Sequence, residues 1–415
     1  HTAYRRQRQM CIRDSNKGFL IHVGIDGFKM INENYGWDYG DYVLRETASC
    51  ILSCISDSQK VYKIASDEFI ILDTTSSDMT TASNLYDHIC KHINQFIEEN
   101  NFAAVFTISA GILPLPDLSQ TGYAELIKRT DFSLAMAKQH GRNCCYIFQE
   151  EEYQNFLRIR EITNELHSAV NHGFRGFSII FQPVMDIRQD KLTGAEVLIR
   201  FTSKKFGPIS PAEFIPLLET SGLIIPTGRW FMREAITACR KIRMQIPDFK
   251  VNINVSQVQI TKSDVITDLI SEMNASGLPP AAIAIELTES ILLEKNEKAQ
   301  NFLKELKQAG LQLALDDFGT GYSNFHYLSE LHPDIVKIDR GFTSKAITDK
   351  KEYYLLNQFS NMIHNLGLKL CIEGIETEDE LQKMKLLKPD YCQGFYWGQP
   401  CLYDEFRKYF VDVKR

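Results

Sequence analysis

Side chains able to do chemistry recur where strand-like runs of this sequence end. Apolar residues fill each run, and acidic, amide or lysine side chains follow near its carboxyl end. These residues are Glu196, Asn254, Glu286, Glu289, Asp316, Asp317, Lys337, Asp339, Glu373, Glu376 and Gln393. An oxygen-rich set without histidine or cysteine favours hard cations such as Mg²⁺ or Mn²⁺. So many carboxylates in one place would repel one another unless cations neutralise them.

The adjacent pair Asp316 and Asp317 is placed to bridge two such ions. Successive side chains point to opposite faces of an ideal strand, but at a strand end one or both can turn to the same side. Two bridged ions are the arrangement that supports in-line hydrolysis of a phosphoester. A single strand-end carboxylate is more often a helix cap or an ion-pair partner, so the prediction depends on the combination.

The elements that must position these residues follow the pattern of a barrel. Strand-like runs occur at residues 177–186, 192–201, 250–256, 283–290, 311–319, 335–342, 368–376 and 391–398. Most are separated by helical segments such as 227–246 and 297–309. Eight strands with intervening helices in about 250 residues predict an α/β fold of the (β/α)8 TIM-barrel type, in which the strand carboxyl ends meet at one rim.

A smaller α/β domain is expected ahead of the barrel, over residues 16–148. Strand-like runs at 18–25, 61–72 and 105–113 alternate with helical spacing at 42–55, 86–97 and 123–140, and the run at 61–72 reads as a hairpin. The charged stretch 149–152 precedes apolar residues at helical spacing, which predicts a linker helix over 149–162. The barrel domain is then expected over 163–410.

Composition excludes several classes of protein. The 415 residues carry a formal charge of −7, which argues against a general DNA or RNA binder. No apolar run is long enough to span a membrane, and the chain begins without a signal-peptide pattern. Ten cysteines are scattered without a CxxC pair, a Cys/His cluster or HExxH, so zinc is not expected. A cytoplasmic location follows, with room for an upstream sensor or anchor in a longer chain. The basic residues 1–15 read better as a remnant of assembly than as a nucleic-acid arm.

Residues 163–410 resemble the EAL-domain family of cyclic di-GMP phosphodiesterases. The resemblance rests on FQPV (181–184), EVLIR (196–200), SPAEFIPLLETSGLI (210–224), NINVS (252–256), ELTES (286–290), DDFGTGYSN (316–324), VKID (336–339), EGIE (373–376) and QGFYWGQP (393–400). Val197 replaces the alanine of the family's EAL motif and leaves Glu196 in place. The resemblance implies metal-dependent hydrolysis of cyclic di-GMP to linear pGpG, with two Mg²⁺ or Mn²⁺ ions in each site.

The resemblance also implies a role for each site residue. One ion would be held by Glu196, Asn254, Glu286 and Asp316, and the second by Asp316, Asp317 and Glu373. Lys337 would orient the attacking water, and Glu289 would brace the loop from Asp317 to Asn324. Glu373 is either a metal ligand or a general base. Substrate contacts are implied for Gln182, Arg200, Pro211, Phe214, Glu376 and Gln393, with Arg200 on a phosphate and with Pro211 and Phe214 against a guanine.

The N-terminal domain resembles the GGDEF family of diguanylate cyclases, through IDGFKMINENYGWDYGD (25–41), ASDEF (65–69) and AKQHGRN (137–143). Gly24 stands where the family has its first metal-binding aspartate, and Ala65 and Ser66 replace two glycines whose lack of a Cβ lets the backbone approach a nucleotide. These departures predict a domain without cyclase activity. The resemblance leaves GTP binding open through Asn32, Asp41, Asp67, Lys138 and Arg142; a purely structural or dimerising domain is the competing interpretation.

Three other functions compete with hydrolysis. A non-catalytic cyclic di-GMP binding module would lack one or more metal-site residues, and this chain keeps them. A net cyclase conflicts with the losses at Gly24, Ala65 and Ser66. A scaffold acting only through protein contacts leaves the acidic rim unexplained. Both family resemblances imply a homodimer.

Overall fold

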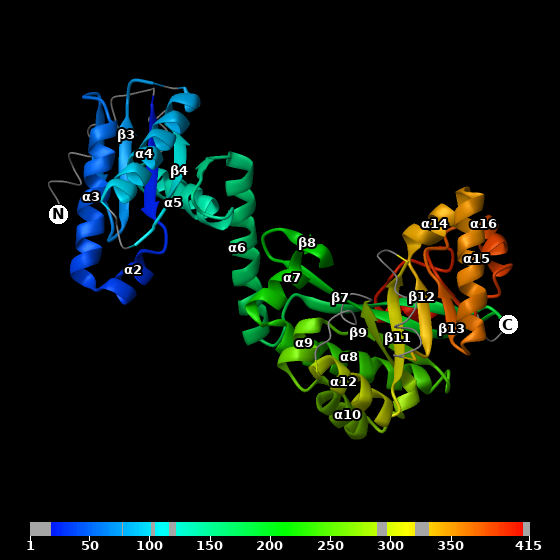
Figure 1. Cartoon of the computed structure of the whole chain (residues 1–415). Helices are drawn as coiled ribbons and strands as arrows, with labels where there is room; N and C mark the ends of the chain where they lie inside the picture. The colour runs from blue at the N-terminus through cyan, green and yellow to red at the C-terminus, as the bar shows by residue number, and fades with distance from the viewer. Residues whose placement is uncertain are drawn as a thin grey trace. The chain divides into compact units, whose positions relative to one another are not determined.

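The computed structural model describes residues 18–76, 78–100, 104–115, 122–288, 297–319 and 332–409. The chain forms two compact units, which divide between Arg158 and Ile159. Each unit is described by itself (Figure 1).

The first unit is built on a sheet with the strand order β2-β3-β1-β4-β5. Its central strand β1 (Phe19–Ile25) runs antiparallel to β3 (Glu68–Asp73) and to β4 (Ile108–Pro114). The predicted hairpin is confirmed, because β2 (Gln59–Lys63) pairs antiparallel with β3. The short edge strand β5 (Cys145–Ile147) pairs parallel with β4.

Helices cover both faces of this sheet. The helices α2 (Phe28–Tyr35), α3 (Trp37–Cys54) and α4 (Met79–Glu99) pack with alternate residues of β1, such as Phe19 and Ile21, in one core. Helix α5 (Tyr123–Gln139) lies on the other face, where the intervening residue Leu20 packs with Leu126. This alternation is the two-residue period of a strand buried on both sides.

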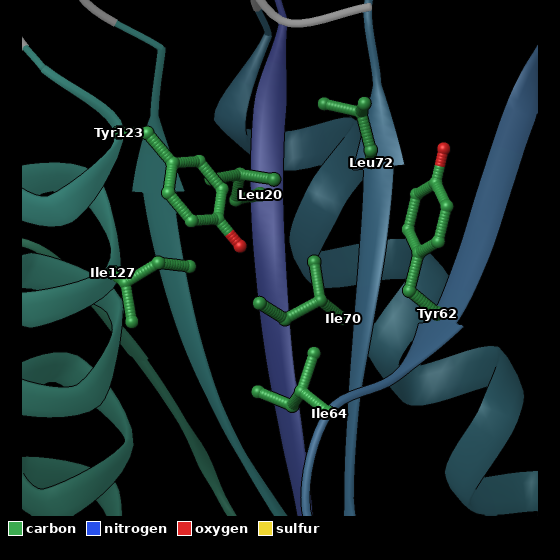
Figure 2. A pocket seen from close by; sticks show the side chains of 7 residues that line it. All are labelled: Leu20, Tyr62, Ile64, Ile70, Leu72, Tyr123 and Ile127. Atoms are coloured by element: carbon green, nitrogen blue, oxygen red, sulfur yellow. The ribbon is translucent and has the colours of Figure 1, made fainter. Parts of the chain in front are cut away.

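A small hollow remains on the α5 side of the sheet (Figure 2). It is lined by apolar and aromatic side chains of β1, β2, β3, α5 and the turn after β2, namely Leu20, Tyr62, Ile64, Ile70, Leu72, Tyr123 and Ile127. Its volume is about 20 Å³, which is close to the space of a single water molecule. It is therefore a gap in the packing and not a ligand site.

The second unit is a closed barrel, which confirms the predicted fold class. Helix α6 (Glu150–Asn171) spans the division between the units. Eight strands then close the barrel: β6 (Phe177–Asp186), β7 (Lys191–Ser203), β9 (Lys250–Asn254), β10 (Ile283–Thr288), β11 (Gln312–Phe318), β12 (Ile335–Ile338), β13 (Lys369–Ile372) and β14 (Tyr391–Gln393). The short strand β8 (Gly207–Ile209) pairs with β7.

One strand departs from the all-parallel pattern. Strand β6 runs antiparallel to both of its neighbours, β7 and β14. The cause is local, since only residues 187–190 separate β6 from β7 and a connection that short can make only a hairpin. The remaining barrel strands pair in parallel, so their carboxyl ends lie at one rim.

Helices surround these strands. They are α7 (Pro211–Ser221), α8 (Ile224–Arg243), α9 (Gln257–Lys262), α10 (Val265–Ser276), α12 (Glu297–Gln308), α14 (Arg340–Thr348), α15 (Lys350–Asn365), α16 (Glu378–Lys385) and α17 (Tyr403–Phe406). Their apolar sides pack on the barrel strands in two large cores. Within the described ranges, no helix is long and apolar enough to cross a membrane.

Candidate active site

A buried lysine lies at the centre of the barrel rim. Lys337 on β12 is 1% exposed, and its Nζ contacts four carboxylates from four other strands or strand ends. The distances from Nζ are 3.4 Å to Glu196 Oε2, 2.9 Å to Glu286 Oε1, 3.1 Å to Asp316 Oδ1 and 2.8 Å to Glu373 Oε1. These five residues are called the Lys337 cluster below. The structure thus brings together side chains that the sequence places far apart.

Two amide side chains hold the Glu196 carboxylate in place. Asn254 Nδ2 donates to Glu196 Oε1 at 2.9 Å, and Gln393 Nε2 donates to Glu196 Oε2 at 2.7 Å and to Gln182 Oε1 at 3.0 Å. These contacts use only the amide nitrogens. The oxygens, Oδ1 of Asn254 and Oε1 of Gln393, can still accept hydrogen bonds or bind a cation. Gln393 Oε1 is buried and has no hydrogen-bond partner among the described residues.

Asn252 is a site residue that the sequence reading missed. Its Nδ2 donates to Glu286 Oε1 at 2.8 Å, as Asn254 does to Glu196. Both asparagines lie on β9, two residues apart, and therefore face the same side of the strand. That two-residue spacing within NINVS was the signal available in the sequence.

The cluster carries more negative charge than its one ammonium can balance. Burial favours a lower pKa for Lys337, but the charges of Glu196, Glu286, Glu373 and Asp316 outweigh it and raise that pKa well above its ordinary value. Burial and the charge of Glu196 raise the pKa of Glu286 well above its ordinary value. Burial raises the pKa of Glu373 to about 8, against the effect of Lys337. Within this cluster, Lys337 therefore balances only part of the negative charge that the ionised carboxylates would carry.

Glu196 behaves in the opposite way. Burial favours a higher pKa, but the Lys337 ammonium and the hydrogen bonds from Gln393 and Asn254 hold the pKa of Glu196 below its ordinary value. This carboxylate is therefore kept ionised inside the barrel. An ionised carboxylate is the form that binds a cation.

The strand β11 breaks its alternation at the two aspartates. Its pairing with β12 shifts register between Leu315 and Phe318, and Asp317 has the left-handed φ of 56°. A non-glycine residue in this region is strained and is held there by its surroundings. Burial and the charge of Asp316 raise the pKa of Asp317. That this pair bridges two ions stays a prediction.

The donor set fits a hard divalent cation. One carboxylate oxygen from each of Glu196, Glu286 and Asp316 lies within 4.8 Å of the others. Glu286 Oε2 is buried and has no hydrogen-bond partner among the described residues, which is a costly state for a polar atom. All three donors are oxygens, the type that Mg²⁺ and Mn²⁺ prefer.

A cavity adjoins the cluster. It has a volume of about 540 Å³ and is lined by Arg200, Pro211 and Asn254, among others, a size typical of small-molecule sites. Arg200 Nη1 donates a hydrogen bond to the Ile199 carbonyl at 2.8 Å, and burial lowers the pKa of its guanidinium. Its positive charge therefore faces a pocket beside an acidic rim.

Phe214 is not in this pocket, which corrects the prediction that it contacts a guanine. Its side chain is fully buried and packs against Phe177 and Phe201 in the core under α7. Phe214 and Pro211 are three residues apart on α7, but Pro211 begins the helix and faces the cavity. An aromatic side chain on a helix packs in the core more often than it contacts a ligand. Phe214 follows this rule because Phe177 and Phe201 surround it.

Two predicted residues lie apart from the cluster. Glu376 forms an ion pair with Arg340 at 2.5 Å and is 39% exposed at its side chain. Asp339 caps the amino end of α14 by accepting a hydrogen bond from the Gly341 amide at 2.7 Å. Glu289 and most of the loop up to Asn324 fall outside the described residues.

In the first unit, the residues around Gly24 contact other residues of the same unit. Asp26 accepts hydrogen bonds from the hydroxyls of Thr107 and Ser109, both at 2.7 Å, and from the Asn143 amide at 3.1 Å. Lys138 Nζ lies 3.8 Å from Glu68 Oε1. A Cβ at Gly24 would lie only 3.0 Å from that same Nζ, so the lysine fills the space beside Gly24.

The residues predicted to contact GTP have different surroundings in the first unit. Asp41 lines a hollow of about 630 Å³ with Asp38, Arg45 and Lys63. Asn32 Oδ1 is buried without a hydrogen-bond partner among the described residues. The other predicted residues are Asp67, which accepts a hydrogen bond from the Ser66 hydroxyl at 2.7 Å, Lys138, and the exposed Arg142, whose φ is 62°.

Known proteins share this organisation. Residues 163–400 match the family model of the EAL domain, and residues 2–144 match that of the diguanylate cyclase GGDEF domain. The chain is 28% identical over 396 residues to the bifunctional diguanylate cyclase/cyclic di-GMP phosphodiesterase MucR of Pseudomonas aeruginosa, covering 94% of this chain and 57% of that protein. It is 28% identical over 387 residues to the cyclic di-GMP phosphodiesterase PdeR of Escherichia coli, covering 93% and 58%. The chain thus spans little more than half the length of these relatives.

Two solved structures agree with this match. The "PaMucR Phosphodiesterase, c-di-GMP complex" has a TM-score of 0.55 and 28% identity, over 59% of this chain and 99% of that one. The "EAL domain Protein from Listeria monocytogenes EGD-e" has a TM-score of 0.52 and 26% identity, over 61% and 98%. Because the EAL model matches more than half of its length, the chain belongs to the EAL domain family and carries a GGDEF domain ahead of its EAL domain.

Proposed function

We propose that the EAL domain of this chain hydrolyses cyclic di-GMP to linear pGpG with the help of two divalent cations, Mg²⁺ or Mn²⁺. The observation that carries the proposal is the Lys337 cluster, in which four buried carboxylates surround one ammonium and Glu286 Oε2 lacks a partner among the described residues. The relatives named above as cyclic di-GMP phosphodiesterases support the choice of substrate.

The residues divide into two groups around the proposed ions. The first ion would be held by Glu196, Asn254, Glu286 and Asp316, and the second by Asp316, Asp317 and Glu373. Bound divalent ions supply charge to a phosphodiester and lower the pKa of water. Lys337 keeps its proton, since the surrounding carboxylates raise its pKa. Its Nζ donors would orient the attacking water and hold the carboxylates in position between turnovers.

The cavity beside the cluster would take the nucleotide. Arg200 supplies a guanidinium for a phosphate oxygen, which offsets the repulsion between an anionic substrate and an acidic rim. Pro211 would pack against a guanine at the cavity wall. Gln182 and Gln393 form one hydrogen-bonded pair and would contact the substrate from β6 and β14. Glu376, which forms an ion pair with Arg340, would contact the substrate at the edge of the site.

Chromatography of cyclic di-GMP tests the proposal. Protein with Mg²⁺ or Mn²⁺ should yield pGpG, and a chelator should stop turnover. Glu196→Gln should lower kcat/KM roughly 10³-fold, because several kcal/mol of charge stabilisation are lost and each 1.4 kcal/mol is a factor of ten. Glu305→Gln, on the exposed side of α12, is the matched control and should keep full activity. Binding of cyclic di-GMP without hydrolysis under either ion would instead identify a binding module.

Two roles for Glu373 make different predictions. If Glu373 is a metal ligand, Glu373→Gln should weaken Mn²⁺ binding, and saturating Mn²⁺ should restore the rate. If Glu373 is the general base, the rate of Glu373→Gln should stay low at any Mn²⁺ concentration, because the variant cannot accept the proton. The dependence of turnover on Mn²⁺ in Glu373→Gln distinguishes the two.

The GGDEF domain is proposed to be inactive as a cyclase and to act as a regulatory or structural partner. Gly24 offers no carboxylate, Lys138 fills the space beside it, and Asp26 is engaged by Thr107 and Ser109. Incubation with GTP should produce no cyclic dinucleotide, and measurable synthesis would contradict the proposal. A change in hydrolysis rate on adding GTP would assign a regulatory role through Asn32, Asp41, Asp67, Lys138 or Arg142. Analytical ultracentrifugation would test whether the chain forms the homodimer that both family resemblances imply.

A further inference from the structure

A cysteine and two histidines meet between two helices of the GGDEF domain. Cys54 ends α3, and His88 and His92 lie one turn apart on α4. One ligand atom of each residue, the Cys54 Sγ and a ring nitrogen of each histidine, lies within 4.8 Å of the others. The sequence reading that no Cys/His cluster exists is therefore wrong, because the packing of α3 on α4 brings distant residues together.

The spacing suits a tetrahedral ion. Zinc bonds of about 2.0–2.3 Å place ligand atoms about 3.3–3.8 Å apart in a tetrahedron, and the observed limit of 4.8 Å needs only a small closing of the side chains. Two histidines at i and i+4 on one helix face are a common way to present two imidazoles to one ion. Their rings stand edge to face with centroids 5.0 Å apart.

Hydrogen bonding prepares one histidine as a ligand. The Ser53 hydroxyl has a single proton and donates it to the Cys50 carbonyl at 2.8 Å. The same oxygen lies 3.4 Å from His92 Nδ1, where it can accept a hydrogen bond from the tautomer that carries the ring proton on Nδ1. His92 Nε2 is then left with a free lone pair, and a second hydrogen bond of this kind is what orients metal-binding histidines.

The cluster is open to solvent. His88 is exposed, and Cys54 and His92 are half-buried, so an ion can enter and a water can complete the coordination. The donors are one sulfur and two nitrogens, whereas the Lys337 cluster offers only carboxylate oxygens. Sulfur and imidazole donors favour zinc over magnesium or manganese.

We propose that Cys54, His88 and His92 form a binding site for Zn²⁺ that joins α3 to α4 and is separate from the EAL-domain ions. On binding, the Cys54 thiol releases its proton to solvent and the thiolate coordinates the ion. The site rests on the geometry of the first unit and does not depend on the proposed hydrolysis.

Cobalt absorption tests this site in the untagged 415-residue chain. Metal-stripped protein titrated with Co²⁺ should develop the thiolate-to-cobalt charge-transfer band, which an all-oxygen site does not produce. Zn²⁺ added afterwards should bleach the band. Cys54→Ser should abolish the band, and His88→Gln combined with His92→Gln should weaken Co²⁺ binding by more than about 100-fold, since even the loss of an indirect partner costs about 10–100-fold.

The matched control is His167→Gln, an exposed histidine of α6, which should leave the titration unchanged. Circular dichroism of each variant checks that the fold is retained, and the histidine pair keeps the test decisive if Cys54→Ser unfolds. Absence of the band at saturating Co²⁺ overturns the proposal. A band that persists in Cys54→Ser also overturns it, because the thiolate then lies elsewhere.

Discussion

At the scale of residues, the Lys337 cluster concentrates four carboxylates on one ammonium inside a barrel. Isolated charges are very costly to bury, and a buried group that loses its partner is strongly destabilising. Amide side chains donate hydrogen bonds to Glu196 and Glu286, and the pKa values of Glu286 and Glu373 are raised. Both effects lower the cost of burying these carboxyl groups. Added positive charge should stabilise such a site, so we expect Lys337 to contribute to stability and, in the proposed reaction, to hydrolysis.

Replacing Lys337 by Met should damage both properties. Metal-free Lys337→Met should lose about 3–5 kcal/mol of unfolding free energy, because the carboxylates lose their only buried counter-charge within the described cluster. Added Mn²⁺ should recover part of that loss but not the hydrolysis rate. Urea unfolding with and without Mn²⁺ measures the effect. Lys369→Met, which removes a half-buried lysine that donates to Tyr391, should cost only about 1 kcal/mol; equal losses in both variants would contradict the central role of Lys337.

Asn252 gives a second test at this scale. Asn252→Ala leaves Glu286 Oε1 without its amide donor and should lower Mn²⁺ affinity or turnover about 10–100-fold, as expected for an indirect partner of a metal site. The Mn²⁺ concentration at half-maximal hydrolysis is the measurement. Unchanged Mn²⁺ dependence would show that Lys337 alone positions Glu286.

At the scale of elements, close packing between helix and sheet, and not secondary-structure propensity, determines which residue type fits at some positions. The clearest case is β4 against α5, where a Cβ on Gly111 would lie 2.3 Å from the Leu134 amide nitrogen and 2.6 Å from Ser133. Neither backbone group can move without shifting α5. The glycine is therefore needed for the approach of the helix to the sheet and not for a turn.

Gly111→Ala should destabilise the GGDEF domain by at least about 1–3 kcal/mol, the usual cost of overpacking. Thermal unfolding of the full chain measures the loss. Gly122→Ala is the control, because a Cβ there meets nothing within 4 Å and its φ is −70°. A neutral Gly111→Ala would mean that α5 can move away from β4.

At the scale of the whole molecule, the two units have separate cores, and each holds a group of potential metal ligands among the described residues. Oxygen donors cluster in one and sulfur and nitrogen donors in the other. A ligand stabilises the part of a protein to which it binds. Different metals should therefore act on different halves of the chain.

Mn²⁺ should stabilise the barrel alone. At a concentration 100 times its dissociation constant, the gain is about 2.7 kcal/mol, visible as slower hydrogen exchange in peptides from β7 to β13 and not in those from β1 to β4. Removal by chelator should reverse the effect, and Glu196→Gln should abolish it. Protection spread equally over both units would argue against a metal site confined to the barrel.

Local patterns were enough to anticipate most of the architecture. The two-residue and helical periods predicted the eight barrel strands and the 61–72 hairpin, because side-chain direction follows from backbone geometry alone. Glu286, Asp316 and Lys337 lie within the last three residues of their strands, whereas Glu196 lies in the middle of β7 and not at its predicted strand end. The domain limits 16–148, 149–162 and 163–410 stay predictions. The antiparallel direction of β6 was also within reach, since the short 187–190 connection requires it.

Other features depended on contacts between distant segments. Phe214 and Pro211 share one helix, yet the neighbours of α7 bury the first and expose the second to the cavity. Cys54 meets His88 and His92 only because α3 packs on α4, and Asp317 is turned by a break in pairing with β12. Periodicity describes which way a side chain points from its own element, whereas what it meets there is decided by the packing of elements that the local sequence does not describe.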